Sequence, residues 1–580
     1  MDQKRLLLAI ALSLGIMLVF QFGFETYLPH PAPPAQITAQ TSPASSDDAL
    51  NPNAGAPSAA QIAPVIGPVL PVDGPKLSGS ITLTGAIFDN VVLKDYHDTV
   101  APDSPLVQIM GRIGGKYPSY AQFGWTAQGG IPVPTNATLW AASAPRLTPQ
   151  TPVTLSWDNG HGVTFELLLA LDDHYMFTIQ QAVINHTGAP ISIFPWSRVV
   201  RDYQPVGPTS YILYEGPLGV FNHTLNQISY KTIKSDGTAA PGGQAFTETS
   251  PGGWIGITDK YWLTALAPDQ AASLTGSMTY GKVTDGDGNA YQTSFITAKP
   301  LIIAPGATGS FQTHLFTGAK VVKLLDAYQT EYGIPDFYKS IDFGHLYFIT
   351  KPIFFALDYL NALLGNFGLA IMVFTVGMKL LFFPLASYSY RSMGKMKLVQ
   401  PKIKALREQF KDDNTKLQQA TMALYKAEKI NPASGCLPML VQIPVFFSLY
   451  KVIFITIEMR QAPFYGWIKD LSVPDPTNLF NLFGLIPYDP TQLSPLLHLG
   501  ALPIIMGITM FLQQRMNPAP PDPVQARMFQ FMPIIFTFVL ARSPAGLVLY
   551  WAWNNLLSVG QQWLIMRQTR QAGLRSLVKT

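Results

Sequence analysis

The chain has 580 residues, of which 48% are hydrophobic and 13% are charged. Soluble domains carry about 25% charged residues, so this composition favours a membrane protein. The net charge of +4 is too small to indicate a nucleic-acid-binding protein, and the single cysteine, Cys436, excludes a disulfide bond within the chain.

The chain opens with an apolar run, Leu6 to Phe20, that directly follows Lys4 and Arg5. These basic residues place the N-terminus in the cytoplasm. A cleaved signal peptide would give a similar pattern, but no small-residue cleavage site follows closely, so residues 1–28 are interpreted as a transmembrane anchor. Residues 29–75 are rich in Pro, Ala, Ser and Gln, a composition typical of an extended linker.

Residues 76–335 have the pattern of an all-β domain. Short apolar or alternating runs, such as Ile81–Leu93, Val163–Leu171 and Tyr175–Asn185, are separated by Asp, Gly, Asn and Pro. Alternation with a period of two is typical of strands that have one buried face. Several strands of this kind predict a large sandwich of two sheets.

The remaining chain has a helical pattern. In residues 343–365, apolar side chains recur at helical spacing, which predicts an amphipathic helix. This helix either lies in the membrane interface or packs on protein, and the sequence does not separate the two. Residues 366–570 contain five candidate spans: Gly368–Ala386, Cys436–Ile457, Leu496–Leu512, Phe529–Leu540 and Ala545–Ile565. With the N-terminal anchor, we expect six transmembrane helices.

Charge placement predicts the orientation of these spans. The segment from Arg391 to Lys429 holds ten Lys or Arg residues, and residues 571–580 form a basic tail. Basic loops stay in the cytoplasm, so this segment and the C-terminus are expected inside. The loop from Glu458 to Pro495 has two basic and four acidic residues and is expected outside, together with the β domain.

Residues 400–430 predict a cytoplasmic helical hairpin. Met396, Val399, Ile403, Leu406 and Phe410 repeat at helical spacing before the turn sequence KDDN, and a second periodic segment follows it. Two helices joined by a short turn pack against each other. The charged face of such a hairpin is either a solvated surface or a binding surface.

Polar residues inside the candidate spans are the strongest functional signal. Lys379 lies within the first span, where a lysine costs about 2.5–3.5 kcal/mol at the bilayer centre. Thr375 is one helical turn away from it. Gln442 lies in the second span, and Asn554, Asn555, Gln561 and Gln562 lie in the last. These side chains either join helices by hydrogen bonds or line a hydrated path. Lys379 either faces that path or extends its stem toward the headgroups.

No catalytic or metal-binding motif is present: HExxH, GxxxxGK[ST] and the nucleophile elbow are all missing, and the nine histidines are scattered. We therefore expect no enzymatic activity and no cofactor. A polytopic transporter and a membrane-anchored binding module remain as alternative functions. A transporter usually contains internal repeats, which this sequence lacks. A binding module would leave Lys379 and the hairpin unexplained.

Several long blocks resemble the YidC/Oxa family of membrane protein insertases, in its long Gram-negative form. The blocks are Gln400–Val452, Glu458–Pro476, LPIIMGITMFLQQRM from Leu502, and the last span with its WNNLLSVGQQ. MDQKRLLLAIALS at the start of the chain and DDHYMFTIQQAVINHTGAPI in the β domain are also similar. The resemblance covers nearly the whole chain.

This resemblance implies an α-helical polytopic protein of the bacterial inner membrane. It implies a five-helix insertase core around a hydrophilic groove and a periplasmic β-supersandwich. Nascent membrane proteins are the implied substrates, with the ribosome, the Sec translocon and membrane lipids as partners, and without direct recognition of nucleic acid. A basic residue of the groove, usually Arg, precedes the Pro of the second transmembrane helix by five positions. Here that residue is Lys379, five before Pro384.

The family pattern also places Thr375, Gln442, Tyr550 and Trp551 near substrate. A Tyr is usual at the position of Trp551, and Lys379 keeps the charge of the usual Arg without its planar, five-donor guanidinium. We therefore expect attraction of acidic substrate segments at Lys379, but not a contact that depends on bidentate geometry.

Overall fold

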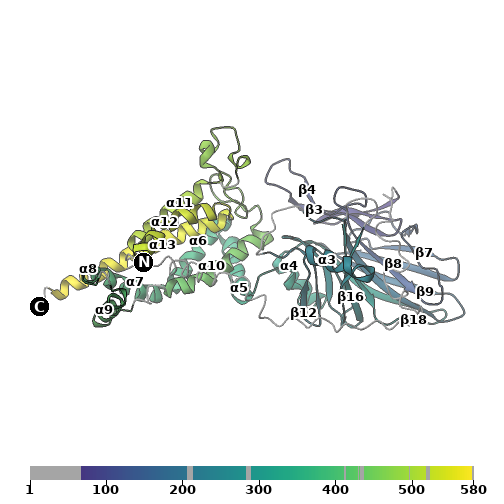
Figure 1. Cartoon of the computed structure of the whole chain (residues 1–580). Coiled ribbons are helices and arrows are strands. Elements are labelled where there is room, and N and C mark those ends of the chain that lie inside the picture. Colours follow the sequence, from purple (N-terminus) through teal and green to yellow (C-terminus); the bar gives the residue numbers. More distant parts are fainter. Residues whose placement is uncertain are drawn as a thin grey trace. The chain divides into compact units, whose positions relative to one another are not determined.

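The computed structural model describes residues 67–205, 213–282, 289–410, 413–428, 430–431, 437–494, 497–517 and 523–577. The predicted anchor, nearly all of the predicted linker, Cys436 and the end of the predicted tail lie outside these residues. Figure 1 shows the strands of the first half and the helices of the second half.

The β domain consists of two antiparallel sheets among the described residues. The larger sheet follows the order β1-β2-β3-β5-β10-β17-β16-β13, with β4 beside β3 and β18 beside β10. Its strands are β1 Val69–Asp73, β2 Leu77–Thr82, β3 Ile87–His97, β4 Leu106–Met110, β5 Ser119–Ala127, β10 Ile191–Arg201, β13 Gln244–Pro251, β16 Ser273–Lys282, β17 Asn289–Thr297 and β18 Leu301–Ile303.

The second sheet follows the order β12-β11-β14-β15-β19-β9-β8-β7-β6. Its strands are β6 Ala141–Ala142, β7 Val153–Asp158, β8 Val163–Leu171, β9 Met176–Asn185, β11 Gly216–Phe221, β12 Thr224–Gln227, β14 Trp254–Thr258, β15 Trp262–Pro268 and β19 Thr308–Ala319. In β8, every second residue from Val163 to Leu171 is buried, as the alternation predicts.

Aromatic contacts join the two sheets into one core. Phe88 of β3 meets Phe177 of β9 edge-on, with ring centroids 5.6 Å apart. Trp125 of β5 lies 5.1 Å from Phe165 of β8. Because these pairs come from opposite sheets, the predicted all-β sandwich is confirmed.

The β domain begins earlier than the sequence predicts. Strand β1 lies inside the range assigned to the linker, and Val69 pairs with Thr82 of β2. Leu70 and Val72 of this strand are buried, and Pro71 lies between them. Strand β1 is at the edge of its sheet, where a proline is tolerated because no further strand needs its missing N–H. The proline-rich composition concealed this strand.

The described helices are α3 Tyr230–Ala239, α4 Val322–Glu331, α5 Tyr347–Leu364, α6 Phe367–Leu381, α7 Phe383–Leu398, α8 Gln400–Gln409, α9 Asn414–Ala427, α10 Leu437–Ile455, α11 Ala501–Met516, α12 Pro523–Leu540 and α13 Ala545–Leu577. Short 3₁₀ helices are η4 Pro241–Gly243, η5 Phe337–Ser340, η7 Ile457–Met459, η8 Leu479–Gly484 and η9 Pro490–Gln492. Helix α5 occupies the predicted amphipathic segment, and α8 and α9 occupy the predicted hairpin.

The first expected span, Gly368–Ala386, is not one straight helix. Helix α6 ends at Leu381, and α7 begins at Phe383 after a bend of 69°. Pro384 lies in the first turn of α7, where its missing N–H costs least. Among the described residues, no single helix combines the length and hydropathy needed to cross a membrane, whereas α6 and α7 taken together do so. Six spans therefore remain a prediction.

Candidate functional site

Helix α6 positions Lys379 against α13. The side chain of Asn366 caps the start of α6 by accepting a hydrogen bond from the Leu369 N–H at 3.1 Å. Four turns later, the Lys379 ammonium donates a hydrogen bond to Ser558 Oγ of α13 at 2.7 Å. Thr375 is buried one turn before Lys379, and its hydroxyl donates to Ile371 O of its own helix at 2.6 Å.

A second polar contact joins α10 to α13. The side-chain amide of Gln442 donates a hydrogen bond to the hydroxyl of Tyr550, which is buried. A buried tyrosine hydroxyl needs such a partner, because leaving it unpaired costs about 1–3 kcal/mol. This contact therefore fixes α10 beside α13 at the level of Tyr550.

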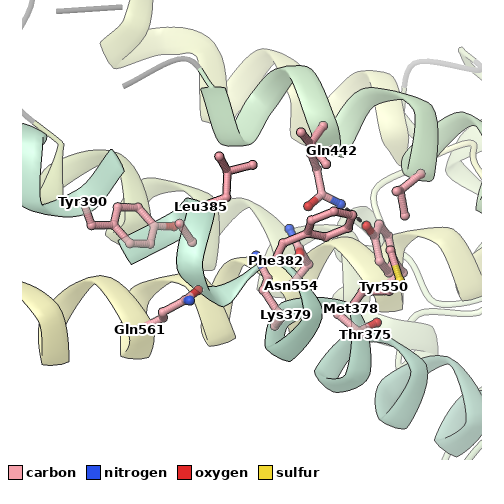
Figure 2. Close-up of a pocket in the computed structure, with 13 residues that line it drawn as sticks. Thr375, Met378, Lys379, Phe382, Leu385, Tyr390, Gln442, Tyr550, Asn554 and Gln561 are labelled. Carbon is pink, nitrogen blue, oxygen red and sulfur yellow. Dashed lines mark hydrogen bonds between the residues drawn. The ribbon is translucent and has the colours of Figure 1, made fainter. Parts of the chain in front are cut away.

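These side chains surround a pocket of about 40 Å³. Figure 2 shows residues from α6, α7, α10 and α13 around it. Its polar lining residues are Thr375, Lys379, Tyr390, Gln442, Tyr550, Asn554 and Gln561. Among the lining residues, Lys379 alone carries a charge, and no ion pair joins it within the described residues. The volume suits a few water molecules, since one needs about 10–15 Å³ by the same measure.

Helix α13 contributes a polar stripe to this pocket. Tyr550, Asn554, Ser558 and Gln561 follow one another at intervals of four, four and three residues, which places them on one helix face. The Ser558 hydroxyl donates to Asn554 O at 2.7 Å and thereby presents its lone pairs to Lys379. The amide atoms of Gln561 are buried without a hydrogen-bond partner in the described part of the chain. Such a group is suited to bonding water or substrate.

A buried loop covers the end of the helices away from the hairpin. The backbone N–H groups of Ala545 and Gly546, which begin α13, donate to Val473 O at 2.7 Å and to Leu471 O at 2.9 Å. The carboxylate of Asp475 accepts from the N–H of Leu502 at 2.7 Å, near the start of α11. These bonds hold the starts of two helices on the same loop.

The structure does not bring Trp551 to the pocket. Its ring meets Phe446 of α10 at 4.7 Å and Phe536 of α12 at 5.8 Å between centroids. Neighbouring residues on a helix point about 100° apart, so Tyr550 and Trp551 serve different surfaces. The predicted substrate contact of Trp551 remains a prediction.

Comparisons with known proteins agree across the whole chain. A family profile described as "YidC periplasmic domain" matches residues 69–356, and one described as "60Kd inner membrane protein" matches residues 359–572. Proteins named "Membrane protein insertase YidC" are similar to this chain. The protein from Granulibacter bethesdensis is 56% identical over 98% of both chains. The protein from Acidiphilium cryptum is 55% identical over 87% of this chain and 85% of its own.

The chain belongs to the YidC family. This assignment confirms the resemblance described above and makes the chain a membrane protein insertase of the inner-membrane type with a periplasmic domain. A crystal structure titled "Active YidC insertase crystal structure with the first transmembrane domain resolved" aligns with 86% of this chain and 94% of its own, at 16% identity and a TM-score of 0.34.

The sequence does not single out every residue at this site. Asn554 and Gln561 are recognisable as polar residues in the last span, but Tyr390, which lines the pocket, and Ser558, which accepts from Lys379, are not. Serine and tyrosine are ordinary in helices, so neither attracts notice alone. The spacing of Ser558 with Tyr550, Asn554 and Gln561 was the available signal.

Proposed function

We propose that this YidC family member inserts membrane proteins by receiving polar substrate segments at the pocket around Lys379. The observation that carries the proposal is the single positive charge in a pocket whose other lining groups are neutral. A fixed cation of this kind attracts the acidic flanks of a substrate helix. The other polar side chains then supply hydrogen bonds that lipid cannot.

The low dielectric of this environment strengthens the attraction. Two opposite charges 4 Å apart gain about 1 kcal/mol in water and about 4 kcal/mol at an effective dielectric constant of 20. A hydrated pocket within the helices shortens the apolar distance that a polar flank must cross. The apolar part of the substrate then enters lipid, where each buried CH₂ gains about 0.8 kcal/mol. No nucleotide is needed for this process.

The same proposal includes the orientation and the partners. The N-terminus, the hairpin and the C-terminal tail lie in the cytoplasm, and the β domain lies in the periplasm. The loop that covers the starts of α11 and α13 then closes the pocket toward the periplasm. The charge pattern of the loops supports this orientation. Nascent membrane proteins, ribosomes, the Sec translocon and lipids are the proposed partners, and the chain acts with or without the translocon.

The test is complementation of a depleted strain by Lys379→Arg, Lys379→Gln and Lys379→Glu at matched expression, with substrates of varied tail charge. We expect Lys379→Arg to be active. Lys379→Gln should reduce the insertion rate of substrates with acidic tails about tenfold, which corresponds to about 1.4 kcal/mol. Lys379→Glu should reduce it further because it repels such tails.

Lys395→Glu provides the matched control, since Lys395 is exposed on the neighbouring helix α7. This control should insert every substrate at the normal rate. Full activity of Lys379→Glu with all substrates would contradict a role for the charge. It would leave Lys379 as a residue that only extends toward the headgroups.

A further inference from the structure

The segment of residues 478–493, between α10 and α11, carries many large apolar side chains on its surface. We call this segment the apolar loop. Leu485 is 83% exposed and Leu493 is 79% exposed. The exposed apolar and aromatic residues of the loop are Leu479, Phe480, Leu482, Phe483, Leu485, Ile486, Tyr488 and Leu493. Asp489 is the single charged residue in this segment.

The polar groups of the apolar loop bond inward. The side chain of Asn481 accepts from the Gly484 N–H at 2.9 Å and donates to Tyr488 O at 3.3 Å. The Tyr488 hydroxyl donates to Phe480 O at 2.8 Å. Asp489 is exposed, and its carboxylate accepts from the N–H and the hydroxyl of Thr491 at 2.9 and 2.7 Å. Such pairing within the segment suits an apolar surrounding, where backbone groups must find partners within the protein.

The base of the loop is fixed to the segment just before α11. The Leu479 N–H donates to Leu499 O at 2.8 Å, and the Asn478 side chain donates to Leu497 O at 2.8 Å. At the tip, Leu482 and Phe483 adopt left-handed backbone angles, with φ of 52° and 58°. Non-glycine residues rarely adopt this conformation. The loop is therefore a defined structure that holds its apolar side chains outward.

Helix α11, which follows this loop in the chain, also has exposed apolar side chains. Ile508 of α11 is 56% exposed, and Ile505, Phe511 and Leu512 are exposed as well. In an inner-membrane family, exposed apolar side chains on these helices face lipid acyl chains. The apolar loop adjoins this helix in the chain and has almost no charge, so it fits the same surrounding better than a charged protein partner. Aromatic residues such as Tyr488 are also typical of the membrane interface.

We propose that the apolar loop inserts into the headgroup–acyl boundary of the leaflet that borders the start of α11. Under the orientation proposed above, this is the periplasmic leaflet. The loop shares its base with Asp475, whose carboxylate accepts from the Leu502 N–H. Insertion of the loop therefore sets the depth at which α11 begins.

The test places a fluorescent NBD label on the full chain with Cys436→Ser and Leu485→Cys, in vesicles of phosphatidylethanolamine and phosphatidylglycerol. Two matched positions serve as references. Ile508→Cys reports the lipid-facing side of α11, and Ile302→Cys reports an exposed apolar residue of the β domain, 70% exposed. Nitroxide lipids labelled near the headgroup and aqueous iodide serve as the quenchers.

We expect nitroxide lipids to quench the label at Leu485 about threefold more than the label at Ile302, because an interfacial segment lies about 5–10 Å deep. Iodide should quench the label at Leu485 about threefold less than at Ile302. The vesicles contain no other protein, so a translocon cannot contact the loop in place of lipid. Each labelled chain must also insert a test substrate at the normal rate.

Iodide quenching at Leu485 equal to that at Ile302 would overturn the proposal. Protection from iodide without quenching by nitroxide lipids would also overturn it, since this result indicates contact with protein. Iodide added to one side of the membrane identifies the side on which the Ile302 label lies. An inserted loop on the side of the membrane opposite to the Ile302 label would refute the orientation and leave the insertion of the loop intact.

Discussion

Glu458, just after α10, has a carboxyl group in an unusual position. One oxygen, Oε1, accepts a hydrogen bond from the Val322 N–H at 3.1 Å. Val322 begins α4, and no side chain of its own segment caps that helix. The other oxygen is buried without a partner among the described residues. Burial raises the pKa of Glu458 to about 7. The folded protein thus holds this proton more tightly than the unfolded chain does.

This raised pKa predicts how stability depends on pH. A pKa near 7 in place of about 4.5 corresponds to on the order of 3 kcal/mol. The folded state binds the proton more tightly than the unfolded state, so this contribution is present below about pH 4.5 and is lost as pH rises through 7. Glu458→Gln keeps an acceptor for Val322 and should be more stable than the wild type at pH 8, but not at pH 4.5.

Unfolding of the purified protein in detergent, followed from pH 4.5 to pH 8, measures this difference. Glu331→Gln is the control, because Glu331 is exposed at the end of α4. The control should follow the wild type at every pH. If Glu458→Gln also follows the wild type, burial of the carboxyl group does not govern this dependence.

At the scale of single residues, the sequence predicts the charged and amide groups of the pocket but not their partners. Lys379 and Gln442 stand out because polar groups are costly in apolar segments. Ser558 becomes significant only when α6 and α13 lie side by side, 179 residues apart in the chain. Trp551 adjoins Tyr550 in sequence, yet it packs against Phe446 and Phe536. The direction in which each side chain points is set by tertiary packing, and no local sequence pattern predicts it.

Among the elements, the hairpin of α8 and α9 has its own small core. Val399, Ile403, Tyr425 and Ile430 are buried together there. The Lys402 ammonium also meets the Glu428 carboxylate at 2.6 Å, although an exposed pair of this kind contributes only about 0–1 kcal/mol. We therefore expect that this unit can be removed without unfolding the helices that surround the pocket.

We predict that replacing residues 400–427 by a short Gly/Ser linker reduces insertion while α10, α11 and α13 stay assembled. This prediction rests on the proposal that the basic hairpin receives substrates or their ribosomes. Insertion rates in reconstituted vesicles measure the effect. Reversal of the exposed charges Lys402 and Lys404 to Glu leaves the hairpin in place and isolates the role of charge. Unchanged rates for both variants would refute a receiving role.

The bend between α6 and α7 is a helix boundary that hydropathy alone does not predict. The apolar run Gly368–Ala386 has the length of a span, and the prediction of a single helix follows from that length. Pro384 was the local signal for a boundary, because a proline is favoured in the first turn of a helix. The angle of 69° itself depends on the contacts of both helices with α13 and cannot be read from the run.

At the scale of the whole molecule, the pocket and the β domain are separate in the chain. Every polar lining residue lies after Gly368, whereas β19 ends at Ala319. Contacts between the two regions exist: the Arg460 guanidinium lies over the Trp262 ring at 5.2 Å and donates to Asp98 O at 3.1 Å. These contacts are at the surface of the helical part and do not involve the pocket.

We therefore predict that deletion of residues 69–319, with the N-terminal anchor retained, leaves substantial insertion activity. Cuts at these positions remove β1 and β19 entire, so no unpaired strand remains. Complementation at matched protein levels measures the activity. Arg460→Ala in the full chain tests the contact between the regions without removing the domain and should have little effect. Loss of activity in the deletion, at normal protein levels, would show that the domain is needed directly.

The two sheets of the β domain were predictable as a class but not as an arrangement. Alternation along Val163–Leu171 indicates a strand with one buried face. It does not indicate that β8 lies between β7 and β9, or that β10 pairs with β5 and β17. Strand order depends on contacts between residues far apart in the chain. The periodicity of the sequence does not report these contacts.

The small volume of the pocket has an electrical consequence. A bacterial inner membrane stores energy as a voltage, and moving one charge through 100 mV is worth about 2.3 kcal/mol. A cavity of about 40 Å³ has room for only a few water molecules. We therefore expect the protein without substrate to pass little ionic current. We also expect the helices to separate only while a substrate occupies the space between them.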